Sequence, residues 1–305
     1  MPRSSAPLAA PDWIAVDWGT SRLRAWAIRD GRAVDARASD DGMASLTQDE
    51  FERALLSLVA DWLGDDATDV IACGMVGARQ GWIEAPYRAV PCPPAGDGAV
   101  TAPARDPRLR VRILPGLRQD DPPDVMRGEE TQIAGVLSAH PGFDGTLCLP
   151  GTHTKWVRVS AGEVVGFRTF MTGELFALIA GRSVLRHSVD DGWDDAAFAT
   201  AAAEGLSRPE QVAARLFGLR AEGLLTGHAP GVARARLSGL LIGMELAAAR
   251  GWWLGTDVLL MGDGVQAGAY RTALAAEGVA ARIAPAEDAT LAGLIAARAA
   301  IGAPA

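Results

Sequence analysis

Short apolar stretches separated by polar, glycine-containing turns predict a three-stranded meander at the start of the chain. The apolar run 13–18 leads into the turn Gly19-Thr20-Ser21, and residues 23–28 alternate well enough for a second strand. Residues 32–39 form the third predicted strand, after Asp30-Gly31, a dipeptide typical of a hairpin. Because only short turns separate these strands, we expect each to pair antiparallel with the next.

The same order of strands and turns begins again in the second half of the chain. Strands are predicted at 146–149, 156–159 and 164–170, with a polar turn at 150–154 between the first two. The repeat is one of pattern rather than of sequence identity, and it predicts a duplicated α/β fold. Pro141-Gly142 marks the boundary between a first domain, residues 1–140, and a second domain, residues 141–305.

Helical spacing of apolar residues accounts for much of the remaining chain. Thr47-Gln48-Asp49-Glu50 is a capping box at the start of one predicted helix. Further helices are predicted from near Gly128 and over 172–185, 209–219, 232–250, 265–277 and 287–301, with strands at 70–73, 109–114, 258–261 and 279–283 and a loop over 91–107. The last helix can pack back on the first domain, so the boundary in space need not follow the boundary in sequence.

Composition narrows the class of protein. The chain has 305 residues, enough for about two domains, and its 49% hydrophobic and 22% charged residues exclude a largely disordered chain. A net charge of -8 argues against nucleic acid as a partner. No apolar run approaches the roughly 20 residues that cross a bilayer, so we expect no membrane partner. The three scattered cysteines form no CxxC pair, which favours a reducing, cytoplasmic location.

The first turn of the meander has the residues of a phosphate-binding turn. Gly19 lets the backbone approach phosphate oxygens, and the hydroxyls of Thr20 and Ser21 can donate to them. Asp17, at the end of the preceding strand, can hold Mg²⁺ through water. Considered alone, the segment is explained equally well by an ordinary hairpin with an aspartate cap.

A second turn of this kind lies at the equivalent place in the second half. Gly151 and Thr152 repeat the glycine and hydroxyl, and two such turns are less easily due to chance than one. Lys155, the sole lysine of the chain, would add a cation beside phosphate, unless it is a solvated strand residue. His153 has no metal-ligand partners nearby, which indicates a hydrogen-bonding residue of the turn.

A third glycine turn, Gly262-Asp263-Gly264, lies between the predicted strand 258–261 and the predicted helix 265–277. Glycines let a planar ring or a ribose lie against the backbone, and the N-terminus of a helix attracts anions. We therefore predict that Gly262 and Gly264 contact the adenosine of a nucleotide. Such a turn is weak evidence alone and stronger as the third of a series.

Three glycine turns in this order are the arrangement of the actin-like ATPase and sugar kinase superfamily. Longer segments narrow the resemblance from this superfamily to a single family. These segments are 15–21 with 23–26, 74–82 with 84–87, 126–132, 149–156 and 169–176. In these segments the chain resembles the 2-dehydro-3-deoxygalactonokinase family. The resemblance implies two ribonuclease H-like α/β domains around a nucleotide cleft, with ATP and Mg²⁺ bound. It also implies ATP-dependent phosphorylation of the 6-hydroxyl of 2-dehydro-3-deoxy-D-galactonate, a small sugar acid, in galactonate catabolism.

That reaction needs a base. A sugar hydroxyl has a very high pKa, and a carboxylate takes its proton as the phosphoryl group is transferred. In related sugar kinases this carboxylate follows a glycine at the start of a helix, a place that Gly128-Glu129-Glu130 occupies here. Glu129 follows the glycine directly and is favoured, Glu130 stays open, and Asp17 is the next alternative. Either glutamate also suits the N-terminal end of a helix dipole.

The implied substrate also carries a carboxylate beside a keto group, which suits a planar bidentate donor. Arg79 is the leading candidate. The predicted substrate-facing residues are Arg79, Gln80, Trp82, Arg24 and Arg127. Trp82, like the nearby Tyr87, either walls the acid site or packs in the core.

Three other classes of protein share this fold. Nucleotide-driven modules such as actin or a heat-shock chaperone are longer, and a polyphosphate phosphatase would want a basic channel that the net charge does not favour. A repressor of the sugar-kinase type would need a helix-turn-helix ahead of the first strand, where about 12 residues stand. The kinase interpretation is preferred. The preference between galactonate and gluconate epimers, a homodimer and the extent of domain closure stay open.

Overall fold

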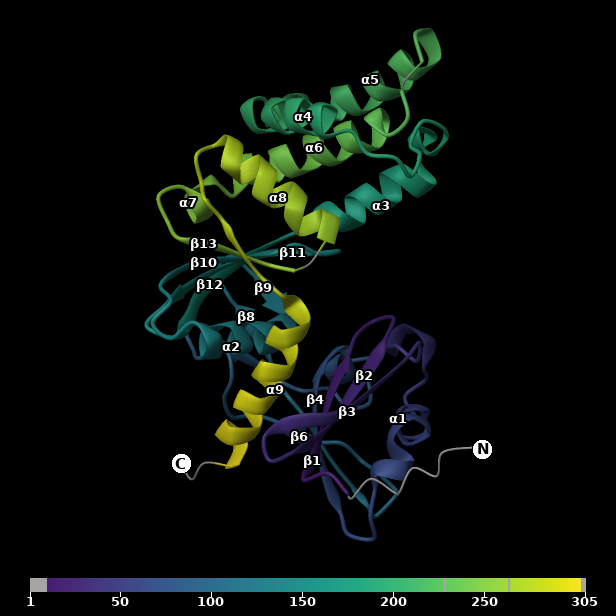
Figure 1. Cartoon of the computed structure of the whole chain (residues 1–305), viewed down its shortest axis with the longest axis vertical. Coiled ribbons are helices and arrows are strands. Elements are labelled where there is room, and N and C mark those ends of the chain that lie inside the picture. The colour runs from purple at the N-terminus through teal and green to yellow at the C-terminus, as the bar shows by residue number, and fades with distance from the viewer. Residues whose placement is uncertain (1–9, 228, 263, 303–305) are drawn as a thin grey trace, which may run out of the picture. The chain divides into compact units, whose positions relative to one another are not determined.

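The computed structural model describes residues 10–227, 229–262 and 264–302, which form two compact units (Figure 1). The first unit contains the chain up to Phe143, Gly162–Val164 and the chain from Glu287 onward. The second contains Asp144–Ala161 and Val165–Ala286. A single division at residue 140 differs from this mainly at the C-terminal helix, which belongs with the first unit. Among the described residues, no helix is both long and apolar enough to cross a membrane.

The first unit is built on a mixed sheet with the strand order β3-β2-β1-β4-β7-β6. The strands are β1 (Trp13–Trp18), β2 (Leu23–Arg29), β3 (Arg32–Ser39), β4 (Thr68–Gly74), β6 (Val100–Thr101) and β7 (Leu109–Ile113). β2 is antiparallel to both β1 and β3, which confirms the predicted meander, whereas β4 and β7 extend the sheet in parallel. The two-residue β6 falls inside the segment predicted as loop, because so short a strand leaves no periodic pattern.

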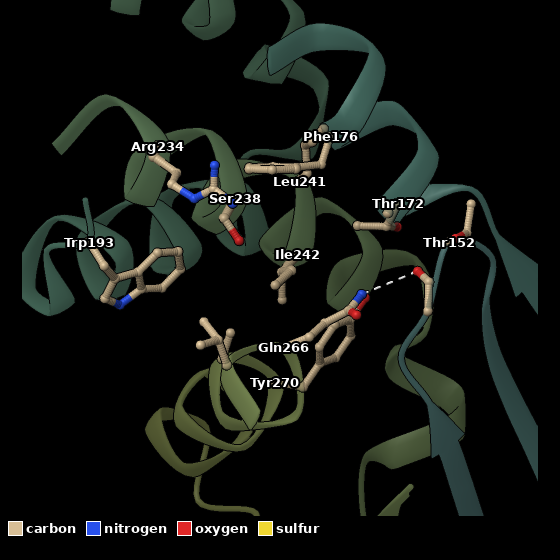
Figure 2. A pocket seen from close by; sticks show the side chains of 14 residues that line it. Thr152, Thr172, Phe176, Trp193, Arg234, Ser238, Leu241, Ile242, Gln266 and Tyr270 are labelled. Carbon is tan, nitrogen blue, oxygen red and sulfur yellow. Dashed lines mark hydrogen bonds between the residues drawn. The ribbon is translucent and has the colours of Figure 1, made fainter. Parts of the chain in front are cut away.

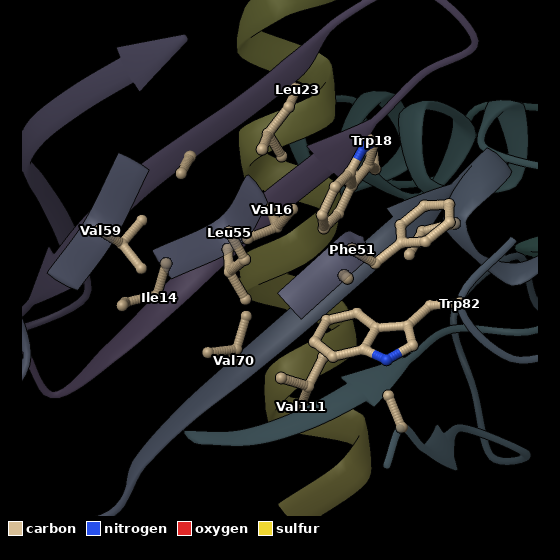
Figure 3. Close-up of a cluster of buried hydrophobic side chains, with 14 of the residues drawn as sticks. Ile14, Val16, Trp18, Leu23, Phe51, Leu55, Val59, Val70, Trp82 and Val111 are labelled. Atoms are coloured by element: carbon tan, nitrogen blue, oxygen red, sulfur yellow. The ribbon is translucent and has the colours of Figure 1, made fainter. Parts of the chain in front are cut away.

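Helices cover both faces of this sheet. They are α1 (Phe51–Val59), α2 (Glu129–Ala139) and α9 (Ala286–Gly302), and a small second sheet contains β5 (Tyr87–Ala89), β8 (Gly116–Gln119) and β9 (Asp124–Met126). On one face Phe51 and Leu55 of α1 pack on Ile14 and Val16, as Figure 3 shows. Strand alternation directs Ala15 to the other face.

The C-terminal helix α9 belongs to the first unit because it packs on the face of the first sheet opposite α1. Leu294 of α9 joins a core cluster with Ala15. α9 also crosses α2 at two glycines, where a Cβ built on Gly135 or Gly293 would lie 1.8 Å from a backbone oxygen of the other helix. The sequence left open whether the last helix packs back on the first domain, and in the structure α9 does so.

The second unit repeats the sheet with the order β12-β11-β10-β13-β14. Its strands are β10 (Gly145–Leu149), β11 (Thr154–Ser160), β12 (Glu163–Phe170), β13 (Val258–Met261) and β14 (Arg282–Ala284). When the strands are numbered within each sheet, both sheets begin with the order third, second, first, fourth; β14 then completes the second sheet, whereas β7 and the short edge strand β6 complete the first. This is the ribonuclease H-like arrangement, and the predicted duplicated α/β fold is confirmed.

Most of the second unit's helices lie between its third and fourth strands. The helices are α3 (Thr172–Arg182), α4 (Asp195–Ser207), α5 (Val212–Leu225), α6 (Val232–Ala248), α7 (Arg250–Trp253) and α8 (Gly264–Ala276). The sequence pattern did not predict α4, whose alanine-rich residues show weak apolar periodicity. It packs closely on α6 through glycines, and a Cβ on Gly243 would lie 2.2 Å from the Ala202 carbonyl oxygen.

Candidate active site

The first phosphate turn leaves β1 in a shape that backbone hydrogen bonds hold. The Gly19 N–H donates to the Arg22 carbonyl at 2.8 Å, and the Ala44 N–H donates to the Thr20 carbonyl at 2.9 Å. Thr20 and Ser21 are exposed. Because both residues face solvent, their hydroxyls are accessible to a ligand.

Asp17 stands at the end of β1 directly opposite Arg24 of β2, where the antiparallel register places them side by side. Arg24 Nη2 lies 2.5 Å from Asp17 Oδ2. Arg24, which was predicted to bind substrate, therefore forms an ion pair with Asp17, which was predicted to hold Mg²⁺. Among the described residues no group of three or more His, Cys, Asp or Glu side chains could hold a metal ion. Mg²⁺ is commonly held by one or two carboxylates with substrate phosphates and water, and the half-buried Asp17 fits that role.

Two glycines bring the start of α2 against the ends of β1 and β4. A Cβ on Gly128 would lie 3.3 Å from the Gly74 Cα, and one on Gly74 would lie 2.7 Å from the Trp18 carbonyl oxygen. Both have positive φ, +105° at Gly128 and +91° at Gly74, a region that side chains disfavour. The sequence-predicted Asp17 turn and the Gly128-Glu129-Glu130 segment therefore meet within the first unit.

The two glutamates that begin α2 have different surroundings. Glu129 is half-buried, and its Oε2 accepts the Arg127 N–H at 3.0 Å. Glu130 is 2% exposed and turns inward, where both carboxylate oxygens accept the Gly128 N–H, at 2.9 and 2.7 Å. Burial, and then the charge of Glu129, raises the pKa of Glu130 to about 8. A carboxyl that keeps its proton at neutral pH is poorly suited to act as a base.

The other residues predicted to bind the sugar acid lie in two different environments. Arg79 and Gln80 are exposed, and the Arg79 side chain, 81% exposed, makes a 3.6 Å ion pair with Glu84. Arg127 is buried, its Cζ lies 4.2 Å from the Tyr87 ring centroid, and its Nη2 donates to the Ala85 carbonyl. Its Nε and Nη1 have no hydrogen-bond partner in the part of the chain described. Arg79 is therefore open to a ligand from solution, whereas Arg127 is enclosed.

Trp82 lies in the hydrophobic core. It is 3% exposed, and its ring centroid lies 6.3 Å from those of both Trp18 and Phe51 (Figure 3). Of the two roles considered for Trp82, the structure shows packing, and the prediction that it faces substrate has no support in its surroundings. Tyr87 packs on Arg127 instead.

The second phosphate turn opens into a pocket of about 320 Å³ within the second unit. Figure 2 shows side chains from α3, α6 and α8 around this space. Gly151 and Thr152 line it, together with Thr172, Gly173, Phe176, Trp193, Arg234, Ser238, Leu241, Ile242, Val265, Gln266, Ala269 and Tyr270. An apolar pocket with a few polar groups at its edge is typical of a small-molecule site.

Two helices hold the second turn in place. The Glu174 N–H at the start of α3 donates to the Thr152 carbonyl at 2.9 Å, and a Cβ on Gly173 would lie 2.2 Å from the Gly151 oxygen. From α8, Gln266 Nε2 donates to the Gly151 carbonyl at 3.2 Å (Figure 2). His153 Nε2 lies 2.6 Å from Glu174 Oε2, so His153 is a hydrogen-bonding residue of the turn.

The structure does not bring Lys155, Gly262 or Gly264 into the lining of this pocket. Lys155 is 5% exposed and, by strand alternation, lies on the face of the sheet opposite Thr154. Gly262 follows β13 and Gly264 begins α8, while Val265 and Gln266, the next residues of α8, line the pocket. Asp263 lies outside the described residues.

The sequence motifs did not predict most residues of the pocket, because its side chains come from separate helices that share no short motif. Glu245, whose hydrogen-bond partners Thr172 and Tyr270 line the pocket, could have been found from the sequence. It is a carboxylate on the apolar side of α6, between Ile242 and Leu246.

The duplicated fold, a turn with glycine and hydroxyl residues after the first strand of each sheet and a pocket beside the second turn are the features expected of a kinase of the actin-like ATPase and sugar kinase superfamily. A model of the 2-keto-3-deoxy-galactonokinase family matches residues 17–297. The chain belongs to this family.

Known proteins similar to the chain agree with the family match. It is 44% identical over 298 residues to a protein of Rhizobium meliloti named as a probable 2-dehydro-3-deoxygalactonokinase, DgoK1, covering 95% of this chain and 97% of that protein. It is 35% identical over 241 residues to the 2-dehydro-3-deoxygalactonokinase of Escherichia coli, covering 78% and 80%. A crystallised Sinorhizobium meliloti protein named for the same kinase superposes with a TM-score of 0.89 at 42% identity, covering 95% and 99%.

Proposed function

We propose that this protein transfers the γ-phosphoryl group of ATP to the 6-hydroxyl of 2-dehydro-3-deoxy-D-galactonate, giving the 6-phosphate and ADP. The observation that carries the proposal is the 44% identity, over 95% of the chain, to a relative named for this kinase. The separate surroundings of Glu129 and of the pocket beside Gly151 support it, because they supply a candidate base in one unit and a candidate nucleotide site in the other.

Glu129 is the proposed base. Its carboxylate is half-buried at the start of α2, whereas the neighbouring Glu130 is enclosed and holds its proton. In the step, the 6-hydroxyl gives its proton to the Glu129 carboxylate as its oxygen bonds to the γ-phosphorus. The bond from that phosphorus to the bridging oxygen breaks, and ADP leaves with the electron pair.

The proposed nucleotide contacts divide between the turns. The residues proposed to contact phosphate are Gly19, Thr20 and Ser21 in the first unit and Gly151 and Thr152 in the second. The base and ribose occupy the pocket lined by α3, α6 and α8. Gly262 and Gly264 of the third turn do not line this pocket, but they precede Val265 and Gln266 of α8, which do. Mg²⁺ would be held by Asp17 and the phosphates, and it would supply positive charge to the triphosphate.

Arg79 is the proposed partner of the acid's carboxylate, with Gln80 beside it. Its guanidinium is exposed and makes only a loose ion pair, so it can exchange Glu84 for a ligand. Arg24 contributes indirectly, since its contact at 2.5 Å orients Asp17. A cytoplasmic location and a homodimer stay predictions.

The test is a coupled ADP-release assay with ATP, Mg²⁺ and a panel of 2-dehydro-3-deoxy sugar acids that includes the galactonate and gluconate epimers. We expect turnover of the galactonate epimer, and phosphorus–carbon coupling in the NMR spectrum of the product at C6. Phosphate found on another carbon would refute the 6-hydroxyl assignment. Absence of ADP release with every acid would refute the proposed activity.

A further inference from the structure

Glu245 of α6 lies behind the pocket of the second unit, and its carboxylate gathers hydrogen bonds from three other elements. Trp156 Nε1 of β11 donates to Oε1 at 2.8 Å, and Tyr270 Oη of α8 donates to Oε2 at 2.7 Å. Thr172 Oγ1, at the start of α3, also donates to Oε2. Only 2% of Glu245 is exposed. Burial raises the pKa of Glu245 to about 6 while these three donors lower it, so the carboxylate is ionised at neutral pH.

Two of the three donors lead from Glu245 to the second phosphate turn. Tyr270 Oη lies 3.0 Å from Thr154 Oγ1, and because the tyrosine proton goes to Glu245, Thr154 donates to Tyr270. Thr172 precedes Gly173, the residue packed against the Gly151 carbonyl. Thr172 and Tyr270 themselves line the pocket. Through Thr172 of α3 and Tyr270 of α8, the Glu245 carboxylate thus connects two helices that line the pocket with the second phosphate turn.

The Glu245 carboxylate holds three donors in a fixed geometry, and two of these donors, Thr172 and Tyr270, line the pocket. A leucine at position 245 would continue the apolar surface of α6 beside Ile242 and Leu246, but it would leave all three buried donors without this acceptor, which is destabilising. Stability and the geometry of the pocket wall therefore both depend on this carboxylate, and binding measurements on folded variants separate the two roles.

We propose that Glu245 is a positioning residue for ATP. It holds Thr172 and Tyr270, and through them the turn at residues 150–153, in the geometry that binds the nucleotide. The inference rests on the proposed nucleotide site. Glutamine cannot replace it fully, because an amide has a single acceptor oxygen and its NH₂ group needs acceptors that the three donors do not offer without turning. Loss of the carboxylate should therefore weaken ATP binding and spare the sugar acid, whose proposed residues lie in the first unit.

The experiment compares full-length variants by titration with a non-hydrolysable ATP analogue and by KM for each substrate. Glu245→Gln removes the charge, Tyr270→Phe keeps the ring wall without the hydroxyl, and Thr172→Val keeps the shape of Thr172. The matched control is Thr146→Val, which removes a fully buried hydroxyl bonded to the Trp252 carbonyl at 2.6 Å, outside the pocket.

We expect the dissociation constant of the analogue and the KM for ATP to rise about tenfold in Glu245→Gln, and about threefold in Tyr270→Phe and Thr172→Val. In Thr146→Val both should stay within about twofold of wild type. The KM for the sugar acid should stay within about twofold in all four variants. A purely structural role would lower the melting temperature and the active fraction without changing either constant of the folded protein.

An unchanged analogue affinity in folded Glu245→Gln would overturn the inference. If Glu245→Gln does not fold, the other two pocket variants decide, and affinities equal to that of Thr146→Val would overturn it. A wild-type protein that binds no analogue would overturn the proposed nucleotide site as well. Wild-type binding together with an unaffected Glu245→Gln would overturn this inference alone.

Discussion

The two units share the order of their first four sheet strands but differ in the segment between the third and fourth strands. In the first unit, residues 40–67 between β3 and β4 include α1, which packs its apolar side on the sheet. In the second unit, residues 171–257 between β12 and β13 supply α3 to α7, and α3 and α6 help to wall the pocket. The same sheet therefore gains this pocket through the helices inserted at that point.

Their acidic residues differ in the same way. Asp17 and Glu129 of the first unit are half-buried, so they can meet a ligand. Glu245 of the second unit is buried behind the pocket and meets only protein groups. Under the proposed function, the first unit supplies the reacting groups and the second supplies a shaped site. Variants of Glu129 and Arg79 in the first unit should therefore change kcat and the KM for the acid, and variants around the pocket of the second unit should change the KM for ATP.

The largest effect is expected at Glu129. Glu129→Gln keeps the size of the side chain but removes the base, so kcat should fall about 10²–10⁴-fold with little change in the KM for ATP. Steady-state kinetics of the ADP-release assay measure this. Glu130→Gln is the matched control and should retain kcat within a few-fold. A dead Glu130→Gln beside an active Glu129→Gln would move the base to Glu130, and normal turnover of both would remove the base from this helix.

Asp17→Asn should lower kcat about 10²-fold and raise the Mg²⁺ concentration needed for half-maximal rate. The physical reason is that the amide strips a negative charge from the proposed metal site and leaves Arg24 without its ion pair. A Mg²⁺ titration at saturating ATP gives both quantities. A reduced rate with an unchanged Mg²⁺ requirement would show that Asp17 acts without the metal.

Arg79→Gln should raise the KM for the sugar acid about 10- to 100-fold, because it removes a charge-assisted hydrogen bond of about 1.5–3 kcal/mol. The KM for ATP should not change. Arg53→Gln is the control, since Arg53 is also largely exposed and also makes one ion pair, with Glu50. Equal KM values for the acid in both variants would mean that another residue binds the carboxylate.

In the second unit, Gly173→Ala should raise the KM for ATP about tenfold and leave the KM for the acid unchanged. The added Cβ would stand 2.2 Å from the Gly151 carbonyl oxygen, so the phosphate turn must shift. Gly181→Ala is the control within the same helix, because a Cβ there meets nothing within 4 Å. If the two variants have the same KM for ATP, the contact of α3 with the turn does not govern nucleotide binding.

Glu130 should also make the stability of the protein depend on pH. Its pKa is raised from 4.5 to about 8, so the folded protein keeps a proton that the unfolded chain has released between these values. Stability should therefore fall as pH rises through this window, by a few kcal/mol at most. Thermal melts of wild type and Glu130→Gln should diverge between about pH 5 and 8, with wild type losing more. If the melting temperatures of the two proteins change with pH by the same amount, the raised pKa of Glu130 is contradicted.

Local sequence was sufficient for the parts of the fold and the site that depend on neighbours in the chain. The meander, the two hairpin-linked phosphate turns and the glycine before α2 follow from short-range patterns, because turn chemistry and strand alternation act over a few residues. The three-stranded sheet of β5, β8 and β9 did not, since strands of three and four residues leave no period to detect.

The family, the repeated strand order and the residues of the turns could all be predicted from the amino-acid sequence. Contacts formed on folding decided instead that Glu130 faces inward while Glu129 stays accessible, that Trp82 packs in the core, and that α9 returns to the first unit. They also decided that Glu245 joins three elements behind the pocket. These outcomes depend on burial and on contacts between residues distant in the chain. Propensity and period cannot encode such contacts, because they describe each segment against solvent rather than against the segment it will meet.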